Sequence, residues 1–135
     1  MTGPRAYLID ASIYIFRAWF SLPDQWHTSA GMPLNAVYGY TRFLLEFLQE
    51  HQPVHCAATF DQSLGSCFRN KLYPGYKASR ELPDEVLGFQ LDTCREITER
   101  LGIPSYGGTD YEADDYLASL ARLYRRRDIP VTVVT

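Results

Sequence analysis

The chain has 135 residues and a formal net charge of −3, and 46% of its residues are hydrophobic and 14% aromatic. This length and composition are typical of one globular domain with its own core over residues 1–135. No apolar run approaches the ~20 residues of a membrane-spanning helix, and the N-terminus lacks a secretory signal pattern, so no membrane association is expected. The three cysteines are odd in number and lack C-x-x-C spacing, which argues against a disulfide framework and favours a reducing, cytoplasmic environment.

The first half of the chain alternates between apolar and amphipathic segments. Residues 6–10 (AYLID) predict a strand, residues 11–22 a helix and residues 54–61 (VHCAATFD) a second strand. Proline, glycine and serine mark residues 21–33 as a loop. Residues 34–49 are expected to form a helix, because apolar side chains recur there at helical spacing: Val37, Tyr40, Leu44, Phe47 and Leu48.

The second half repeats this alternation. A third helix is expected to open at residues 83–85 and to stop at Gly102, with one apolar face: Leu87, Leu91, Cys94, Ile97 and Leu101. Residues 103–108 (IPSYGG) predict a short strand with a turn, and the next helix is expected to turn five residues to the core: Ala113, Leu117, Leu120, Ala121 and Tyr124. Residues 129–135 (IPVTVVT) are continuously apolar, as parallel strands buried on both faces are. The order predicts an α/β fold with an open, mostly parallel sheet and helices on both faces.

Five carboxylates are expected to gather at one edge of this sheet. Asp10 and Asp61 close the first two strands, and Glu112, Asp114 and Asp115 lie in the first turn of the helix after the third strand. Open parallel sheets bind ligands beyond the carboxyl ends of their strands. Acids at a helix start can instead cap it or complement its dipole. The crowding of all five is better explained by divalent cations such as Mg²⁺ or Mn²⁺, which prefer oxygen ligands.

A basic cluster follows the second strand. The segment FRNKLYPGYKASR (residues 68–80) interleaves cations with tyrosines: Arg69, Lys71, Tyr73, Tyr76, Lys77 and Arg80. Basic side chains bind phosphates, and aromatic rings stack on the bases of unpaired strands. Proline, glycine and weak apolar periodicity indicate an arm that leaves the core. An ordinary solvated loop is the alternative, but the position directly after an acidic strand end favours a phosphate-binding role.

Three stretches, LIDAS, FD followed by FRNKLYPGYKASR, and YEADDYLASLA, resemble the 5′-nuclease family. This family comprises the N-terminal 5′–3′ exonuclease domain of bacterial DNA polymerase I, stand-alone 5′–3′ exonucleases and flap endonucleases. The similarity extends over nearly the whole chain, in order. It implies a PIN-like fold and a metal-dependent 5′–3′ exonuclease or flap endonuclease of DNA replication and repair. The substrate would be DNA with 5′ ends, flaps or single-strand/duplex junctions, in the bacterial cytoplasm at the nucleoid.

The resemblance also implies roles for individual residues. Four acids match the first of two metal sites, for Mg²⁺ or Mn²⁺, and a fifth is their neighbour: Asp10, Asp61, Glu112, Asp114 and, as the neighbour, Asp115. Lys77 and Arg80 match residues of a helical arch, about residues 68–83, that position the scissile phosphate. Tyr76 falls where the family can place a base-stacking aromatic, and Arg69 and Lys71 are expected to add DNA contacts.

The chain departs from the family pattern at its end. The family continues with further aspartates of the second metal site and with a segment that holds duplex DNA, whereas this chain stops in VTVVT. A fragment is therefore expected, which as given would be weakly active or inactive in cleavage, and the arrangements considered are a polymerase domain in cis and self-association of the truncated chain. A nucleic-acid-binding module with an incomplete metal site is an alternative. A phosphoryl-accepting receiver domain is another, although Ala11 follows Asp10 and no lysine follows Lys77.

Overall fold

The structure is a computed structural model that describes residues 5–23, 25–60, 84–107 and 113–135, without the side chains of residues 84, 85, 113 and 114. Its elements follow in the order β1 (Ala6–Asp10), α1 (Ala11–Ser21), α2 (Asn35–His51), β2 (His55–Thr59), α4 (Asp84–Arg100), β3 (Ser105–Tyr106), α5 (Ala113–Arg126) and β4 (Val131–Val134).

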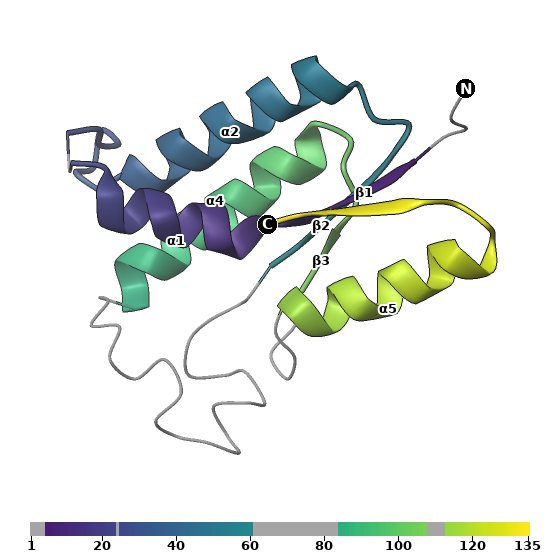
Figure 1. Cartoon of the computed structure of the whole chain (residues 1–135). Coiled ribbons are helices and arrows are strands. Elements are labelled where there is room, and N and C mark those ends of the chain that lie inside the picture. The colour runs from purple at the N-terminus through teal and green to yellow at the C-terminus, as the bar shows by residue number, and fades with distance from the viewer. Residues whose placement is uncertain (1–4, 24, 61–83, 108–112) are drawn as a thin grey trace.

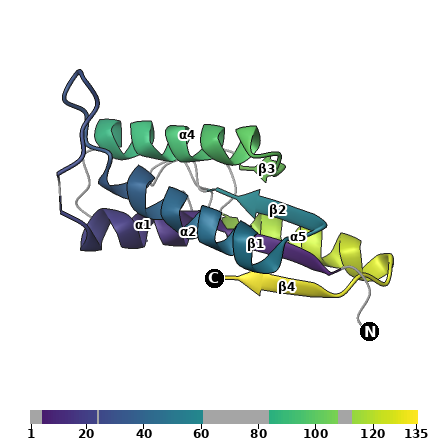
Figure 2. The ribbon, with the colours of Figure 1, turned by 90° about the horizontal axis from the view of Figure 1, so that it is seen from above.

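The described strands form one four-stranded sheet in the order β3-β2-β1-β4, and every neighbouring pair is parallel. Helices α1, α2 and α4 cover one face, and α5 covers the other (Figures 1 and 2). The α/β fold with an open parallel sheet and helices on both faces is thus confirmed. None of the described helices combines the length and the hydrophobicity needed to cross a membrane.

Alternation along β1 divides the core into two clusters. Ile9 belongs to the larger cluster, with side chains from α1, α2 and α4, whereas Leu8 packs on the other face with Ala57, Leu117 and Ala121. Successive strand residues point to opposite faces, so Tyr7 and Ile9 face the larger cluster and Leu8 faces the smaller one. The apolar positions predicted from helical spacing supply most of these contacts: Tyr40, Leu44, Phe47, Leu87, Leu91, Cys94, Leu117 and Ala121.

Two expectations about burial are wrong. Leu101 was expected on the apolar face of the third helix, but it is 42% exposed because α4 ends at Arg100 and the chain turns away at Gly102, where φ is +87°. The last strand was expected to be buried on both faces, but Val133 is 46% exposed. Among the described strands, β4 lies at the sheet edge and pairs only with β1, so it is covered incompletely.

Candidate active site at the carboxyl edge of the sheet

Asp10 lies at the end of β1, where the chain passes directly into α1. The residue is 9% exposed, and its side chain does not cap α1 although it occupies the N-cap position. Because strand residues two apart share a face, Asp10 lies on the same face of the sheet as Leu8, the face that α5 covers. Helix capping, a common role of an aspartate at a strand end, therefore does not explain why an aspartate occupies this position.

The first turn of α5 is held near the same edge. Leu117 and Ala121 anchor α5 on Leu8 and Ala57, and the helix begins on the side of the sheet where β1 and β2 end (Figure 1). Asp114 and the partly buried Asp115 lie in this first turn. The fold thus brings the predicted acidic positions of β1 and α5 to one edge from segments about a hundred residues apart in sequence, as parallel topology requires.

The other predicted site residues lie outside the described residues: Asp61, Glu112, Arg69, Lys71, Tyr73, Tyr76, Lys77 and Arg80. The whole of the predicted arch at residues 68–83 likewise lies outside the described residues. Within the described part of the chain, no three histidine, cysteine or acidic side chains are grouped so as to hold a metal ion. The five-carboxylate cluster therefore stays a prediction, with two of its five side chains described.

An aromatic pair flanks the start of α1. Tyr14 stacks on Phe43 with ring centroids 3.7 Å apart, and the Arg17 guanidinium carbon lies 5.4 Å from the centre of the Tyr14 ring. Burial raises the pKa of the Tyr14 hydroxyl, the Arg17 charge opposes this, and the negative charge of Asp10 raises it further. Sequence reasoning missed Tyr14 and Arg17, although their spacing of one and two helical turns after Asp10 was a usable signal.

Arg95 fastens the ends of β2 and β3 to α4. Its Nη2 donates to the Ser105 carbonyl over 3.3 Å, and its guanidinium carbon lies 5.9 Å from the centre of the Phe60 ring. Gly107 passes so close that a Cβ there would lie 2.7 Å from the Phe60 carbonyl oxygen and 3.0 Å from Arg95 Nη1. This packing fixes Phe60 and Gly107, the last described residues before the predicted ligands Asp61 and Glu112. No sequence signal pointed to Arg95.

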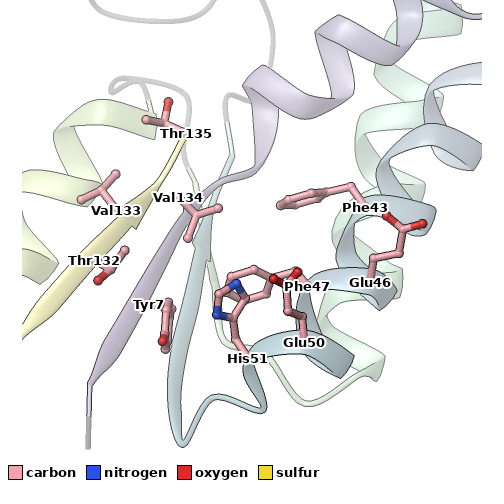
Figure 3. Close-up of a pocket in the computed structure, with 10 residues that line it drawn as sticks. All are labelled: Tyr7, Phe43, Glu46, Phe47, Glu50, His51, Thr132, Val133, Val134 and Thr135. Atoms are coloured by element: carbon pink, nitrogen blue, oxygen red, sulfur yellow. The ribbon is translucent and has the colours of Figure 1, made fainter. Parts of the chain in front are cut away.

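A pocket of about 430 Å³ lies beside β4 on the opposite face of the sheet (Figure 3). The pocket is lined by apolar and aromatic side chains, Tyr7, Phe43, Phe47 and Val134, and by polar side chains of α2, Glu46, Glu50 and His51. Val133 and Val134 point to opposite sides of β4 in this view. The pocket includes none of the predicted site residues, so it is separate from the acidic edge.

The open parallel sheet with acids at its carboxyl edge defines a PIN-like α/β domain. The chain belongs to the family described as "5′-3′ exonuclease, N-terminal resolvase-like domain", which matches residues 5–135. This membership excludes the receiver-domain alternative.

Several known proteins are similar to the chain. DNA polymerase I of Mycobacterium leprae is 40% identical over 136 residues, which cover 99% of this chain and 15% of that protein. The 5′-3′ exonuclease of Aquifex aeolicus is 33% identical over 127 residues, 94% of this chain and 43% of that protein. The chain therefore spans less than half the length of these relatives. The T5 D15 protein, crystallised with metal ions, has the same fold, with a TM-score of 0.61 at 17% identity over 89% of this chain and 44% of its own.

Proposed function

We propose that this domain is a divalent-metal-dependent 5′ nuclease that hydrolyses DNA phosphodiester bonds at 5′ ends, flaps or single-strand/duplex junctions. The observation that carries the proposal is the position of Asp10: a nearly buried carboxylate at a strand end, not used as a helix cap, on the sheet face covered by the helix that bears Asp114 and Asp115. Membership in the 5′-3′ exonuclease family supports the same reaction.

The residues present fit Mg²⁺ or Mn²⁺. Both ions prefer oxygen ligands, and Mg²⁺ is commonly held by only one or two carboxylates together with water and substrate phosphate. Asp10 offers such a carboxylate on a rigid backbone, since every residue of β1 from Ala6 to Asp10 stands in register with β2. Asp61, Glu112 and Asp114 would complete the first of two metal sites, with Asp115 beside it. Bound ions would supply an activated water and stabilise charge on the phosphoryl oxygens.

The chain's own groups would orient the substrate. Carboxylates fixed before substrate binds need no reorganisation as charge develops, which is the main advantage of a preorganised site. Lys77 and Arg80 would neutralise the scissile phosphate from the other side, and Tyr76 would stack on an unpaired base. Arg69 and Lys71 would bind neighbouring phosphates, so they contribute affinity more than rate.

The cellular setting belongs to the same proposal. The relatives named DNA polymerase I suggest that this domain works with a polymerase domain in cis, in replication and repair at the bacterial nucleoid in the cytoplasm. Both exonucleolytic and flap cleavage fit the proposed site, because each presents a 5′ end beside a duplex.

The proposal is tested by incubating the full-length protein, rather than residues 1–135 alone, with 5′-labelled flap DNA in Mg²⁺, in Mn²⁺ and in EDTA. Cleavage is expected with either ion and not in EDTA. Asp10→Asn should abolish it, because the change removes one charged ligand while preserving shape. Asp92→Asn is the matched control, since Asp92 is an exposed acid of α4. Binding without cleavage under all conditions would instead indicate a nucleic-acid-binding module.

A further inference from the structure

A polar side chain is buried where α1, α2 and α4 meet. Gln90 of α4 is 0% exposed, and its Oε1 accepts hydrogen bonds from the backbone N–H groups of Ala36 (2.8 Å) and Val37 (3.0 Å). These are among the first N–H groups of α2, which have no partner within their own helix. The N-cap residue of α2 is Leu34, which offers no side-chain acceptor. Gln90 therefore caps α2 from a different helix.

The same side chain extends the connection to α1. Because Oε1 accepts from two backbone donors, the orientation of the amide is fixed and Nε2 donates to Asn35 Oδ1 over 3.1 Å. Asn35 Nδ2 in turn donates to the carbonyls of Trp19 (3.1 Å) and Leu22 (3.3 Å), at the end of α1. One continuous series of buried and partly buried hydrogen bonds thus joins α4, the start of α2 and the end of α1.

The position of these bonds in the chain gives them functional meaning. α1 begins immediately after Asp10, and α4 begins shortly after Lys77 and Arg80 in the sequence. The end of α1 and the starts of α2 and α4 lie on the same side of the domain (Figure 1). Hydrogen bonds that fix α4 against α1 therefore fix the start of α4, the first described element after the basic segment, relative to the acidic edge of the sheet.

We propose that Gln90, acting through Asn35, is a positioning residue for the nuclease reaction: it holds the helix that follows the phosphate-binding segment in register with the helix that follows Asp10. This inference rests on the proposed function. A misplacement of about 1 Å between reacting groups can cost on the order of a hundredfold in rate. Loss of the bond series should therefore slow cleavage while the phosphate contacts, and hence DNA affinity, change little.

Thr98 supplies a matched control on the same helix. It is also fully buried, and its Oγ1 lies 2.6 Å from the Tyr40 hydroxyl of α2. Thr98 lies two turns further along α4 and joins only α2 and α4. Thr98→Val and Gln90→Met each remove buried hydrogen bonds between these helices with little change in shape, but only Gln90→Met breaks the series that links α4 through Asn35 to α1.

The experiment measures single-turnover cleavage of flap DNA in Mn²⁺ and the Kd for the same DNA in Ca²⁺, at a temperature where every variant is folded by circular dichroism. Gln90→Met is expected to cleave at least about tenfold more slowly with a Kd within about threefold, whereas Thr98→Val cleaves at the rate of the unchanged protein. Gln90→Glu keeps an acceptor for the two N–H groups of α2 and replaces the amide donor to Asn35 by a carboxyl group in the same buried position. It decides the question if Gln90→Met does not fold, and it should also be slower.

Three outcomes would overturn the inference. The first is an unchanged rate in the Gln90 variants, and the second is an equal loss in Thr98→Val, which would make Gln90 a purely structural cap. Absence of cleavage by the unchanged full-length protein would refute the proposed function itself, and this outcome is recognised before any variant is compared.

Discussion

Thr59 lies directly opposite Asp10 at the carboxyl ends of the two central strands. Its fully buried hydroxyl donates to the Ile9 carbonyl over 3.4 Å, so a side-chain bond ties β2 to β1 one residue before the acid. Parallel pairing with β2 extends to Asp10 itself, and pairing with β4 extends to the preceding Ile9. A ligand-binding carboxylate at this position is held by the rigid centre of the sheet rather than by a loop, as a preorganised site requires.

Metal binding should stabilise the folded domain. Mn²⁺ at about 100 times its Kd should add about 2.7 kcal/mol, because the acids are brought together only in the folded state. That corresponds to a rise in Tm on the order of 10 °C. Asp114→Ala should abolish most of the rise, and Asp92→Ala should preserve it. An equal rise in Asp114→Ala would show that this acid only complements the start of α5.

Lys77→Ala should reduce the rate of cleavage much more than the affinity for DNA. A lysine at the scissile phosphate acts mainly on the transition state, so its loss appears in the rate of the bound complex. Arg69→Ala should weaken binding more than it slows the bound complex. Single-turnover rates and Kd values for flap DNA provide the comparison. Equal losses of rate and affinity in Lys77→Ala would identify this lysine as a simple phosphate anchor.

Two glycines within helices should respond to alanine in opposite directions. A Cβ on Gly39 of α2 would lie 2.5 Å from Ala18 Cβ and 2.8 Å from Leu22 Cδ1, so Gly39→Ala should destabilise the domain by about 1–3 kcal/mol. Among the described residues outside its own helix backbone, no atom lies within 4 Å of the same position at Gly88 of α4, so Gly88→Ala should stabilise by about 0.5–1 kcal/mol through helix propensity. Urea unfolding measures both. Stabilisation by Gly39→Ala would contradict the close approach of α1 and α2.

Stability should fall in alkaline solution. Burial raises the pKa of the Cys56 thiol from 9.0 to about 11, and burial likewise raises the pKa values of Cys94 and Tyr40. Because the unfolded chain loses these protons at lower pH, stability that is fully present below pH 9 should be lost progressively as the pH rises towards about 11 and beyond. Cys56→Ala should lessen the decline in urea-unfolding free energy between pH 8 and pH 10. A decline as steep as that of the unchanged protein would rule out a contribution from Cys56.

Periodicity was sufficient to predict the fold because most of its core is built from regular apolar spacing, as in Tyr40, Leu44 and Phe47 of α2. It could not reveal Gln90 and Thr98, two polar residues that are fully buried on α4. Their burial is tolerated because partners on α2 complete their hydrogen bonds, and those partners are near only in the folded chain. The edge position of β4 likewise depends on strand order, which composition does not encode.

The candidate site likewise contains residues that the sequence could predict and residues that it could not. Asp10 was predictable because a strand that ends in an acid places it at the ligand-binding edge. Arg95 was not predictable, because it lies on α4 and contacts Phe60, after β2, and Ser105, in β3, only once this helix packs on the sheet. Tyr14 lay within reach of sequence reasoning, since it follows Asp10 by one helical turn, but its stacking on Phe43 required the fold.

The most direct test of the central claim is the position of Mn²⁺ in crystals of the domain, located by anomalous scattering. The account predicts an ion beyond the carboxyl end of β1, with a carboxylate oxygen of Asp10 as a ligand at a distance of about 2.0–2.2 Å, near the first turn of α5. The same crystals of Asp10→Asn should show weaker occupancy or none. Mn²⁺ bound only elsewhere on the surface, with equal occupancy in Asp10→Asn, would contradict a metal-dependent nuclease site at this edge.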